Sequence, residues 1–398
     1  MNLSLTPLQQ KLSGLARSLA REAFAERAAG YDERAVLPEE NLHDLRAAGL
    51  LNLVVGKDLG GHGSGIGSAD PLLYLLVLEE IAAVCLSTSH CLQVHCHAVQ
   101  FIDRLGTATQ RRHFLLDVVE HGSLMTTLSS EPGRTARGSR NESLARLTPA
   151  GWSLSGVKNY STLAGACKWL LVLTDAHVEN DIAALAPVPV SNGERIASLV
   201  RVDAPGVSFV DQPWNAPGMR AAVSPTVRFE AADVPWSQII GRPNAHLADN
   251  WSVKADLGFA AQYVGAAQGL LDSVTNAVRR RSTASDPHVQ RHVGRLHFTI
   301  QGVRAQYRHA AWLWTQSDEA AAGLASIGAK HQAIEAANQV LDIAARIVGP
   351  TAFLQGSALE RQYRDLRFLT MREHPDPAAT AAGKKLLDGY EGGAHGRA

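Results

Sequence analysis

Two hydroxyl-rich stretches near the middle of the chain carry residue types suited to binding a flat, polar molecule. The first, residues 124–133, reads Leu-Met-Thr-Thr-Leu-Ser-Ser-Glu-Pro-Gly and ends in a Pro-Gly turn. The second, residues 151–162, alternates around Ser155-Gly156, a pattern that predicts a β-hairpin. Backbone N–H groups and Ser and Thr hydroxyls match the carbonyls and nitrogens of a heterocycle. We therefore expect these strands to line the edge of such a ring.

A second group of chemically capable residues is the segment 89–97, which reads Ser-His-Cys-Leu-Gln-Val-His-Cys-His. Helical spacing puts His90 and His97 on one face and turns His95 away, so no single metal ion fits all three well. Histidine titrates near neutral pH, which suits it to acid–base chemistry. A hydrogen-bonded core or surface role is the alternative for each of these histidines.

The length, composition and net charge of the chain limit the class of protein. The chain has 398 residues, 45% of them hydrophobic, which is enough for the cores of two or three domains. Its 38 basic and 38 acidic residues cancel, which predicts neither a nucleic-acid nor a membrane surface. The four cysteines have neither zinc spacing nor the density of a disulfide scaffold. With no apolar signal-peptide core or membrane-length apolar run, we expect a cytoplasmic protein.

Helical periodicity dominates both ends of the chain, and short β-type runs fill the middle. Helices are expected over residues 5–30, 38–49, 72–84, 87–104, 110–121, 255–281, 287–314 and 326–348, and after residue 376. Thr6-Pro7 suits the N-cap and first position of the first helix. Between about 123 and 240, Gly, Pro, Asn and Asp separate the apolar runs, as is typical of strands. The predicted domains are 1–122, 123–240 and 241–398.

Several short motifs resemble the acyl-CoA dehydrogenase superfamily. Ser130-Glu131-Pro132-Gly133 resembles that family's Thr-Glu-Pro turn, and Gly156-x-Lys158 resembles the start of its Gly-x-Lys-x-Trp-Ile-Thr strand. Further similar segments are 105–110, 215–220, 227–235 and 364–367. The resemblance implies an α+β multidomain fold, with an N-terminal α-helical domain, a central β-barrel that holds a flavin ring, and a C-terminal four-helix bundle.

The same resemblance raises the question of a catalytic base. Dehydrogenation of an acyl thioester needs a carboxylate to take the α-proton while flavin N5 takes the β-hydride. In the family this glutamate lies in a Glu-Gly motif after an Arg-Asp-x-Arg segment or on the first bundle helix. Here Glu373 is followed by His374-Pro375, and residues 254–263 contain only Asp256 as an acid. By this comparison both usual base positions are vacant.

The residues in those places are similar to the flavin-dependent monooxygenase branch of the family, the dibenzothiophene monooxygenase-like enzymes. The similar segments are 160–162, 286–294 and 374–377. Enzymes of that branch take reduced flavin from a separate reductase, add O2 at flavin C4a and transfer one oxygen atom to the substrate. They need a water-poor pocket and a hydrogen-bond donor, not a carboxylate base. The resemblance implies a two-component monooxygenase that acts on a small organic substrate.

On this hypothesis three side chains take part in catalysis. Ser161 donates a hydrogen bond near flavin N5 and C4a, and His374 and His95 act as acid–base or donor groups. The cofactor contacts carried over from the resemblance are Leu128, Ser130, Tyr160, Thr162 and Arg281. The family's FAD extends between subunits, and its arginine, matched here by Arg281, holds the adenosine end. Stacked apolar helices in the C-terminal half imply a homotetramer, which the family usually forms. Because Pro350 removes an N–H from the family's glycine turn, FMN is the alternative to FAD.

Two other functions remain open. One is an acyl-CoA dehydrogenase or oxidase with a relocated base, either Glu373 or Asp256. The other is a flavoprotein that binds a partner or nucleic acid without turnover, although the balanced charge argues against DNA. Arginines 134, 137 and 140, in the segment that replaces the family's Gly-Ser-Asp, are candidates for contact with an anion such as coenzyme A.

Overall fold

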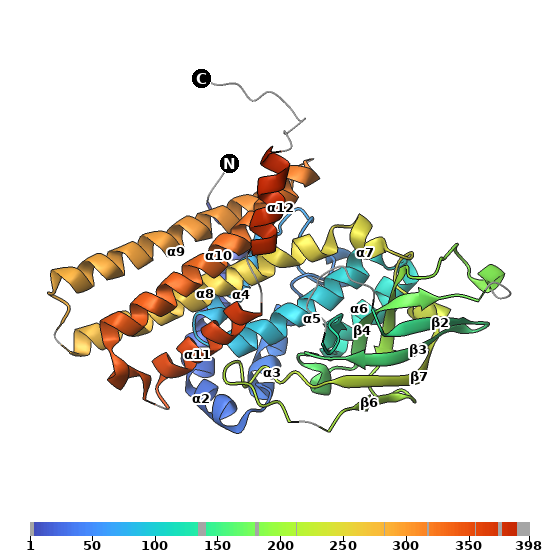
Figure 1. Ribbon diagram of the computed structural model, residues 1–398, viewed down its shortest axis with the longest axis horizontal. Coiled ribbons are helices and arrows are strands. Elements are labelled where there is room, and N and C mark those ends of the chain that lie inside the picture. Colours follow the sequence, from blue (N-terminus) through green and yellow to red (C-terminus); the bar gives the residue numbers. More distant parts are fainter. Residues whose placement is uncertain are drawn as a thin grey trace, which may run out of the picture.

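The computed structural model describes residues 4–133, 141–179, 183–211, 213–281, 283–316, 318–354, 356–372 and 376–387. Helices form both ends of the chain and a sheet forms its middle, as expected (Figure 1). One continuous apolar core joins all three regions. Among the described residues, no helix is long and apolar enough to cross a membrane.

The N-terminal region is a set of packed helices. They are α1 (Pro7–Leu19), the π-helical η1 (Ala20–Phe24), α2 (Ala25–Arg34), α3 (Glu39–Ala47), the 3₁₀ turns η2 (Leu50–Asn52) and η3 (Lys57–Leu59), α4 (Leu72–Ala82), α5 (Leu86–Leu105) and α6 (Ala108–His121). Thr6 caps α1 as predicted, because its hydroxyl accepts from the Gln9 N–H and the Gln9 side chain returns a bond to the Thr6 N–H. Most side chains of α5 are buried, so this helix forms the centre of the region.

The central region is a curled seven-stranded sheet. Its strands are β1 (Met125–Leu128), β2 (Leu144–Thr148), β3 (Gly151–Lys158), β4 (Trp169–His177), β5 (Arg195–Arg201), β6 (Val207–Phe209) and β7 (Val227–Pro235). The pairing order is β1-β4-β2-β3-β7-β6, with β5 on β4. β1 runs parallel to β4 at one end of this order, so no strand among the described residues pairs with its other edge.

The predicted hairpin around Ser155-Gly156 is wrong. Residues 151–158 form one strand, β3, which pairs with β2 on one side and β7 on the other. The register with β7 shifts between Leu154 and Gly156, and Gly156 has φ 138°, so these residues form a bulge. A Cβ at Gly156 would lie 2.4 Å from the Ser143 hydroxyl, which explains why glycine stands there.

The C-terminal region consists mainly of long, side-by-side helices (Figure 1). They are α7 (Ala245–Ala248), α8 (Trp251–Arg280), α9 (Pro287–Leu313), α10 (Glu319–Val348), the 3₁₀ turn η7 (Pro350–Phe353), α11 (Ala358–Met371) and α12 (Asp376–Leu387). The 3₁₀ turns η4 (Ala164–Ala166), η5 (Ala183–Leu185) and η6 (Trp236–Gln238) lie in the sheet region. Helix α11 was absent from the sequence-based expectation, although it carries the Arg364-Asp365 motif.

Close contact between α4 and α8 ties the bundle to the N-terminal region. A Cβ at Gly269 would lie 1.8 Å from the Ala83 carbonyl oxygen, so only glycine allows this approach. Glu79 of α4 accepts from the Arg304 guanidinium of α9 at 2.5 Å and from the Tyr307 hydroxyl. These contacts hold α8 and α9 against α4, and α8 contributes to the site described next.

Candidate active site

The open edge of β1 is the first wall of the site. The Met125 N–H points to this edge and donates to His95 Nδ1 at 3.2 Å. Because successive residues of a strand alternate in direction, the main-chain groups of Thr127 point the same way. The Thr127 hydroxyl oxygen is buried and has no hydrogen-bond partner among the described residues. Leu128, a predicted contact, is buried at the end of the strand, and Ser130 is exposed just beyond it.

The second wall is the loop that follows β3. The Asn159 N–H donates to the Ser130 carbonyl at 3.0 Å, so the two hydroxyl-rich stretches do meet. Thr162 is buried, and its hydroxyl lies 2.7 Å from that of Ser224. Ser161 is fully buried, with its hydroxyl donating to the Lys158 carbonyl at 3.4 Å. Tyr160 is 64% exposed and has φ 51°.

A buried ion pair joins these walls. Lys158 Nζ lies 2.7 Å from Glu131 Oε1, and both side chains are almost fully buried. Glu131 also accepts from the N–H groups of Glu142 and Ser143, at 2.7 and 3.1 Å. Burial lowers the pKa of Lys158 to about 8, and Glu131 opposes that shift. The Glu and Lys of the two motifs therefore fix the backbone around the site.

The two walls fit a flat heterocycle with polar edges. The side-chain oxygens of Thr127 and Asn159 are both buried and lack partners within the described part of the chain. Buried polar atoms are rarely left unpaired, so a bound polar group is the natural partner for them. Thr127 and Asn159 were not among the predicted contacts. The alternation of strand β1 could have pointed to Thr127.

A chain of contacts leads from this loop to the helices. The Tyr160 ring meets Trp214 edge-on at 6.4 Å, and Trp214 meets Phe368 of α11 at 6.0 Å. The Trp214 indole N–H donates to the Met219 carbonyl at 3.2 Å. The Ser87 hydroxyl, at the start of α5, lies 4.0 Å from the Met219 sulfur. His90 follows Ser87 by about one helical turn.

The histidine face of α5 lies against α8. The rings of His90 and His97 lie 6.0 and 5.9 Å from the ring of Phe259. Desolvation by burial, with a smaller contribution from Arg372, lowers the pKa of both His90 and His97 to about 3. Both imidazoles are therefore neutral at physiological pH. Helical spacing predicted that these two histidines share one face, but neither was among the predicted catalytic residues.

His95, the histidine that was selected, lies on the other side of α5. Its Nε2 donates to the Leu51 carbonyl at 3.2 Å, while its Nδ1 accepts from Met125. Both ring nitrogens are thus occupied by main-chain groups. Burial lowers its pKa to about 4, so this neutral ring bridges η2 and β1. The geometry gives His95 a structural position, with no nitrogen left for a substrate.

Replacing His95 by leucine is expected to lower the free energy of unfolding by about 2–5 kcal/mol, because two buried main-chain groups lose their partners. Chemical denaturation measures this change. His95→Gln is the matched control, since an amide both donates and accepts, and it should recover part of the loss. Wild-type stability in His95→Leu would contradict the bridging role.

The acidic candidates for a base differ in their surroundings. Asp256, on α8, is buried and lies 2.7 Å from the ammonium group of Lys330 on α10. The Asp256 carboxylate is therefore already paired with a cation. Glu373 and His374 lie outside the described residues, as do the predicted anion contacts Arg134, Arg137 and Arg140. Arg372, the last described residue before Glu373, has its guanidinium 4.4 Å from the centre of the Phe259 ring.

Asp365 of the Arg-Asp motif supports the turn that carries Met219. Its carboxylate accepts from the Met219 N–H at 2.6 Å, and it is buried. Burial raises the pKa of Asp365 from 3.8 to about 6. Between these values the folded protein binds more protons than the unfolded chain, so the free energy of unfolding falls as pH rises through this window.

Asp365→Asn is expected to remove this pH dependence, because the amide oxygen can still accept from Met219 and does not ionise. Thermal melts of both proteins from pH 4.5 to 7.5 measure the effect. The wild type should lose up to about 3 kcal/mol relative to the variant across that range. Parallel pH profiles would show that Asp365 does not titrate there.

Arg281, the predicted contact for the far end of FAD, is not brought to the sheet. It follows α8, about 45 Å along the helix from Trp251 at 1.5 Å per residue. Its guanidinium donates to the Val348 carbonyl, and it lines a cavity of about 440 Å³ with Ser357 and Leu359. Within one chain, Arg281 and the ring site are separate.

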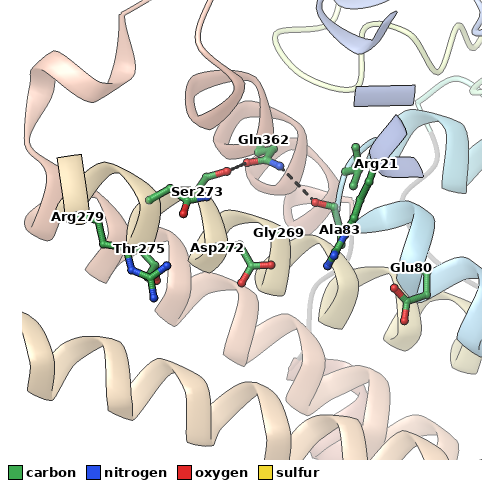
Figure 2. Close-up of a pocket in the computed structure, with 11 residues that line it drawn as sticks. Arg21, Glu80, Ala83, Gly269, Asp272, Ser273, Thr275, Arg279 and Gln362 are labelled. Carbon is green, nitrogen blue, oxygen red and sulfur yellow. Dashed lines mark hydrogen bonds between the residues drawn. The ribbon is translucent and has the colours of Figure 1, made fainter. Parts of the chain in front are cut away.

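A second cavity, of about 620 Å³, lies between η1, α4, α8 and α11 (Figure 2). Arg21, Glu80, Asp272 and Arg279 are among its lining residues, and the Ser273 hydroxyl donates to Gln362 at 2.6 Å. This cavity contains none of the predicted site residues.

Comparisons with known proteins match this architecture. Models of the acyl-CoA dehydrogenase N-terminal and C-terminal domains match residues 6–121 and 257–373. The acryloyl-CoA reductase (NADH) of Anaerotignum propionicum is 24% identical over 94% of this chain and 92% of its own length. The dibenzothiophene monooxygenase of Rhodococcus erythropolis is 26% identical over 87% of this chain and 86% of its own length.

Solved structures show the same fold. The butyryl-CoA dehydrogenase of Megasphaera elsdenii superposes with a TM-score of 0.85 at 20% identity, over 97% of this chain and all of its own. The dibenzothiophene monooxygenase of Paenibacillus sp. A11-2, solved with FMN and indole, has a TM-score of 0.83 at 20% identity, over 95% of this chain and 97% of its own. With family domains matched at both ends of a shared architecture, the chain belongs to the acyl-CoA dehydrogenase family and is a flavin-dependent oxidoreductase.

Proposed function

We propose that this protein is a two-component monooxygenase that uses reduced flavin, supplied by a separate reductase, and O2 to oxygenate a small organic substrate. The observation that carries the proposal is the make-up of the helix face to which the contacts from the Tyr160 loop lead. That face has two neutral imidazoles, while its described acid, Asp256, is paired with Lys330. A paired, buried carboxylate is a poor base for an α-proton.

The cofactor assignment is FAD, with FMN as the alternative. The open edge of β1, Ser130 and the loop with Tyr160 and Thr162 would hold the flavin ring, and Asn159 and Thr127 offer unpaired oxygens to its polar edge. A bound reduced flavin supplies the electrons for activating O2. This part of the proposal is supported by the relatives that are dibenzothiophene monooxygenases and by the related structure solved with FMN.

The side chains of this chain have three tasks in the proposal. Phe259 and Trp251 pack against the histidine face and exclude water from it. His90 and, from outside the described residues, His374 hold or move a proton at the reacting groups. Ser161, with its hydroxyl directed to the Lys158 carbonyl, keeps the loop closed and offers its oxygen as a hydrogen-bond partner.

Stopped-flow mixing of the flavin-reduced protein with O2 tests this function. We expect a transient absorbance that differs from the spectra of both reduced and oxidised flavin. Direct reoxidation with no transient, with FAD and with FMN alike, would contradict the proposal.

An acyl-CoA dehydrogenase or oxidase is the second candidate. It is favoured by the family match, which runs through residue 373 and so includes Glu373, and by relatives such as the isobutyryl-CoA dehydrogenase of Dictyostelium discoideum. Bleaching of the oxidised, protein-bound flavin by an acyl-CoA without oxygen would establish this candidate. A flavoprotein that only binds a partner would give neither signal.

The proposed assembly is a homotetramer in the cytoplasm. Helix α9 exposes Phe298 at 74% and Trp312 at 37% on its surface, which suits contact with another copy. The far end of the flavin would extend beyond the chain that binds its ring, and a second copy would place its Arg281 near that end. All four cysteines are buried and unbridged, as suits a reducing compartment.

A further inference from the structure

The orientation of the Gln262 side chain can be read from its neighbours. The Ser89 hydroxyl donates its only hydrogen to the Leu78 carbonyl at 2.9 Å. Ser89 must therefore accept, through its oxygen, from the Gln262 amide nitrogen 3.1 Å away. This assigns the amide, whose two ends are otherwise hard to distinguish, and turns its oxygen toward His90. Both Ser89 and Gln262 are fully buried.

The same reasoning fixes the proton on His90. Gln262 Oε1 lies 3.5 Å from His90 Nδ1, a long contact in which only the imidazole can be the donor. Since burial keeps this ring neutral, a proton on Nδ1 leaves a lone pair on Nε2. In the part of the chain that the structure describes, Nε2 has no hydrogen-bond partner, and the residue is 6% exposed.

We propose that Ser89 and Gln262 form a positioning relay that holds His90 as the Nδ1–H tautomer, so that Nε2 serves as the proton or hydrogen-bond acceptor of the active site. The relay runs from the Leu78 carbonyl through Ser89 and Gln262 to His90. Neither Ser89 nor Gln262 needs to touch the substrate. The inference rests on the proposed function in one respect: that function supplies the substrate toward which His90 Nε2 would be directed. An acceptor at Nε2 selects substrates that present an O–H or N–H group to it.

Other charged groups near His90 do not supply this bias. Arg372, at the end of α11, is a cation and cannot accept a proton from either ring nitrogen. His97 lies about two helical turns after His90 on α5, and its Nε2 is 3.4 Å from the Gln93 amide nitrogen. Lys330 Nζ lies 5.6 Å from the centre of the Phe259 ring and is paired with Asp256 at 2.7 Å. Of the described contacts, the Gln262 oxygen alone meets a ring nitrogen of His90.

Neutron diffraction from deuterated crystals of the full chain tests the relay, because it locates the exchanged protons. We expect a deuteron on His90 Nδ1 facing Gln262, none on Nε2, and the Ser89 deuteron directed at the Leu78 carbonyl. In Gln262→Met, which keeps the side-chain volume, the His90 deuteron should move to Nε2 or divide between the nitrogens. A deuteron on Nε2 alone in the wild type would overturn the proposal, as would an unchanged pattern in Gln262→Met.

Two further variants separate the relay from a general packing role. Ser89→Ala leaves Gln262 in place but frees its amide to turn, so it should also loosen the His90 assignment. Gln268→Met changes a half-buried glutamine of the same helix that bonds to Asp272 and Arg304, and it should leave the His90 pattern unchanged. These readouts do not require flavin chemistry. A correct tautomer without the stopped-flow transient would therefore count against the monooxygenase and not against the relay.

Discussion

Lys158→Met is expected to lower the free energy of unfolding by about 3–5 kcal/mol and to abolish stable flavin binding. The substitution removes one partner of a buried ion pair, and breaking such a pair costs about that much. Flavin binding fails with it, because Glu131 also holds the main chain at Glu142 and Ser143 beside the ring site. Urea denaturation and the flavin content of the purified protein measure the two effects.

A double variant provides the control for this prediction. In Lys158→Met combined with Glu131→Gln the buried charge is gone, while the amide oxygen can still accept from the main chain. The double variant should be more stable than Lys158→Met alone, since the coupling between the two sites is favourable only when both charges are present. If the loss of stability in the double variant equalled the sum of the losses in the two single variants, the pair would not act as a unit.

His90→Leu is expected to slow oxygen transfer by about 10²–10⁴-fold, the range for removing a positioned acid–base group. Flavin binding should change little, because the described contacts of His90 are with Gln262 and Phe259 of α8 and not with β1 or the loop after β3. Turnover is measured as product formed per reduced flavin consumed, with a substrate that presents an O–H or N–H group.

His113→Leu is the matched control, because His113 is an exposed residue of α6 outside the site. It should keep wild-type turnover. His95→Leu adds a second comparison. If its turnover per folded, flavin-loaded protein fell by about 10²–10⁴-fold while His90→Leu kept wild-type turnover, the assignment of roles to the two histidines would be reversed.

Much of the fold could be predicted from local signals in the sequence. The Thr6-Pro7 cap, the apolar repeat of α5 and the Gly- and Pro-separated strands act within a few residues, so their pattern is visible in the chain. The alternation in residues 151–158 was also correct, but a two-residue turn and a bulge look alike there. Pairing of β3 with β2 and β7 on its two edges decides between them, and that is a long-range property.

The candidate site was predictable only in part, for the same reason. Helical phase correctly separated His90 and His97 from His95, but not which face meets the site. Which face meets the site depends on the main-chain groups of Met125 and Leu51, which bond to both ring nitrogens of His95. It also depends on the contact between the rings of Phe259 and His90. Nor does the sequence indicate that Asp256 pairs with a lysine on another helix. Thr127 lies on the open edge of β1, and only the strand order makes that edge open.

The central claim is that the flavin ring lies against the β1 edge with neutral histidine, and no free carboxylate, on its substrate side. A crystal structure of the flavin-saturated protein measures this most directly. We expect the ring to contact Thr127 and Thr162, with His90 on its substrate side and the Glu373 carboxylate out of hydrogen-bond reach. A Glu373 oxygen within about 3.2 Å of a ligand atom above the ring would contradict the claim and assign the protein to the dehydrogenases.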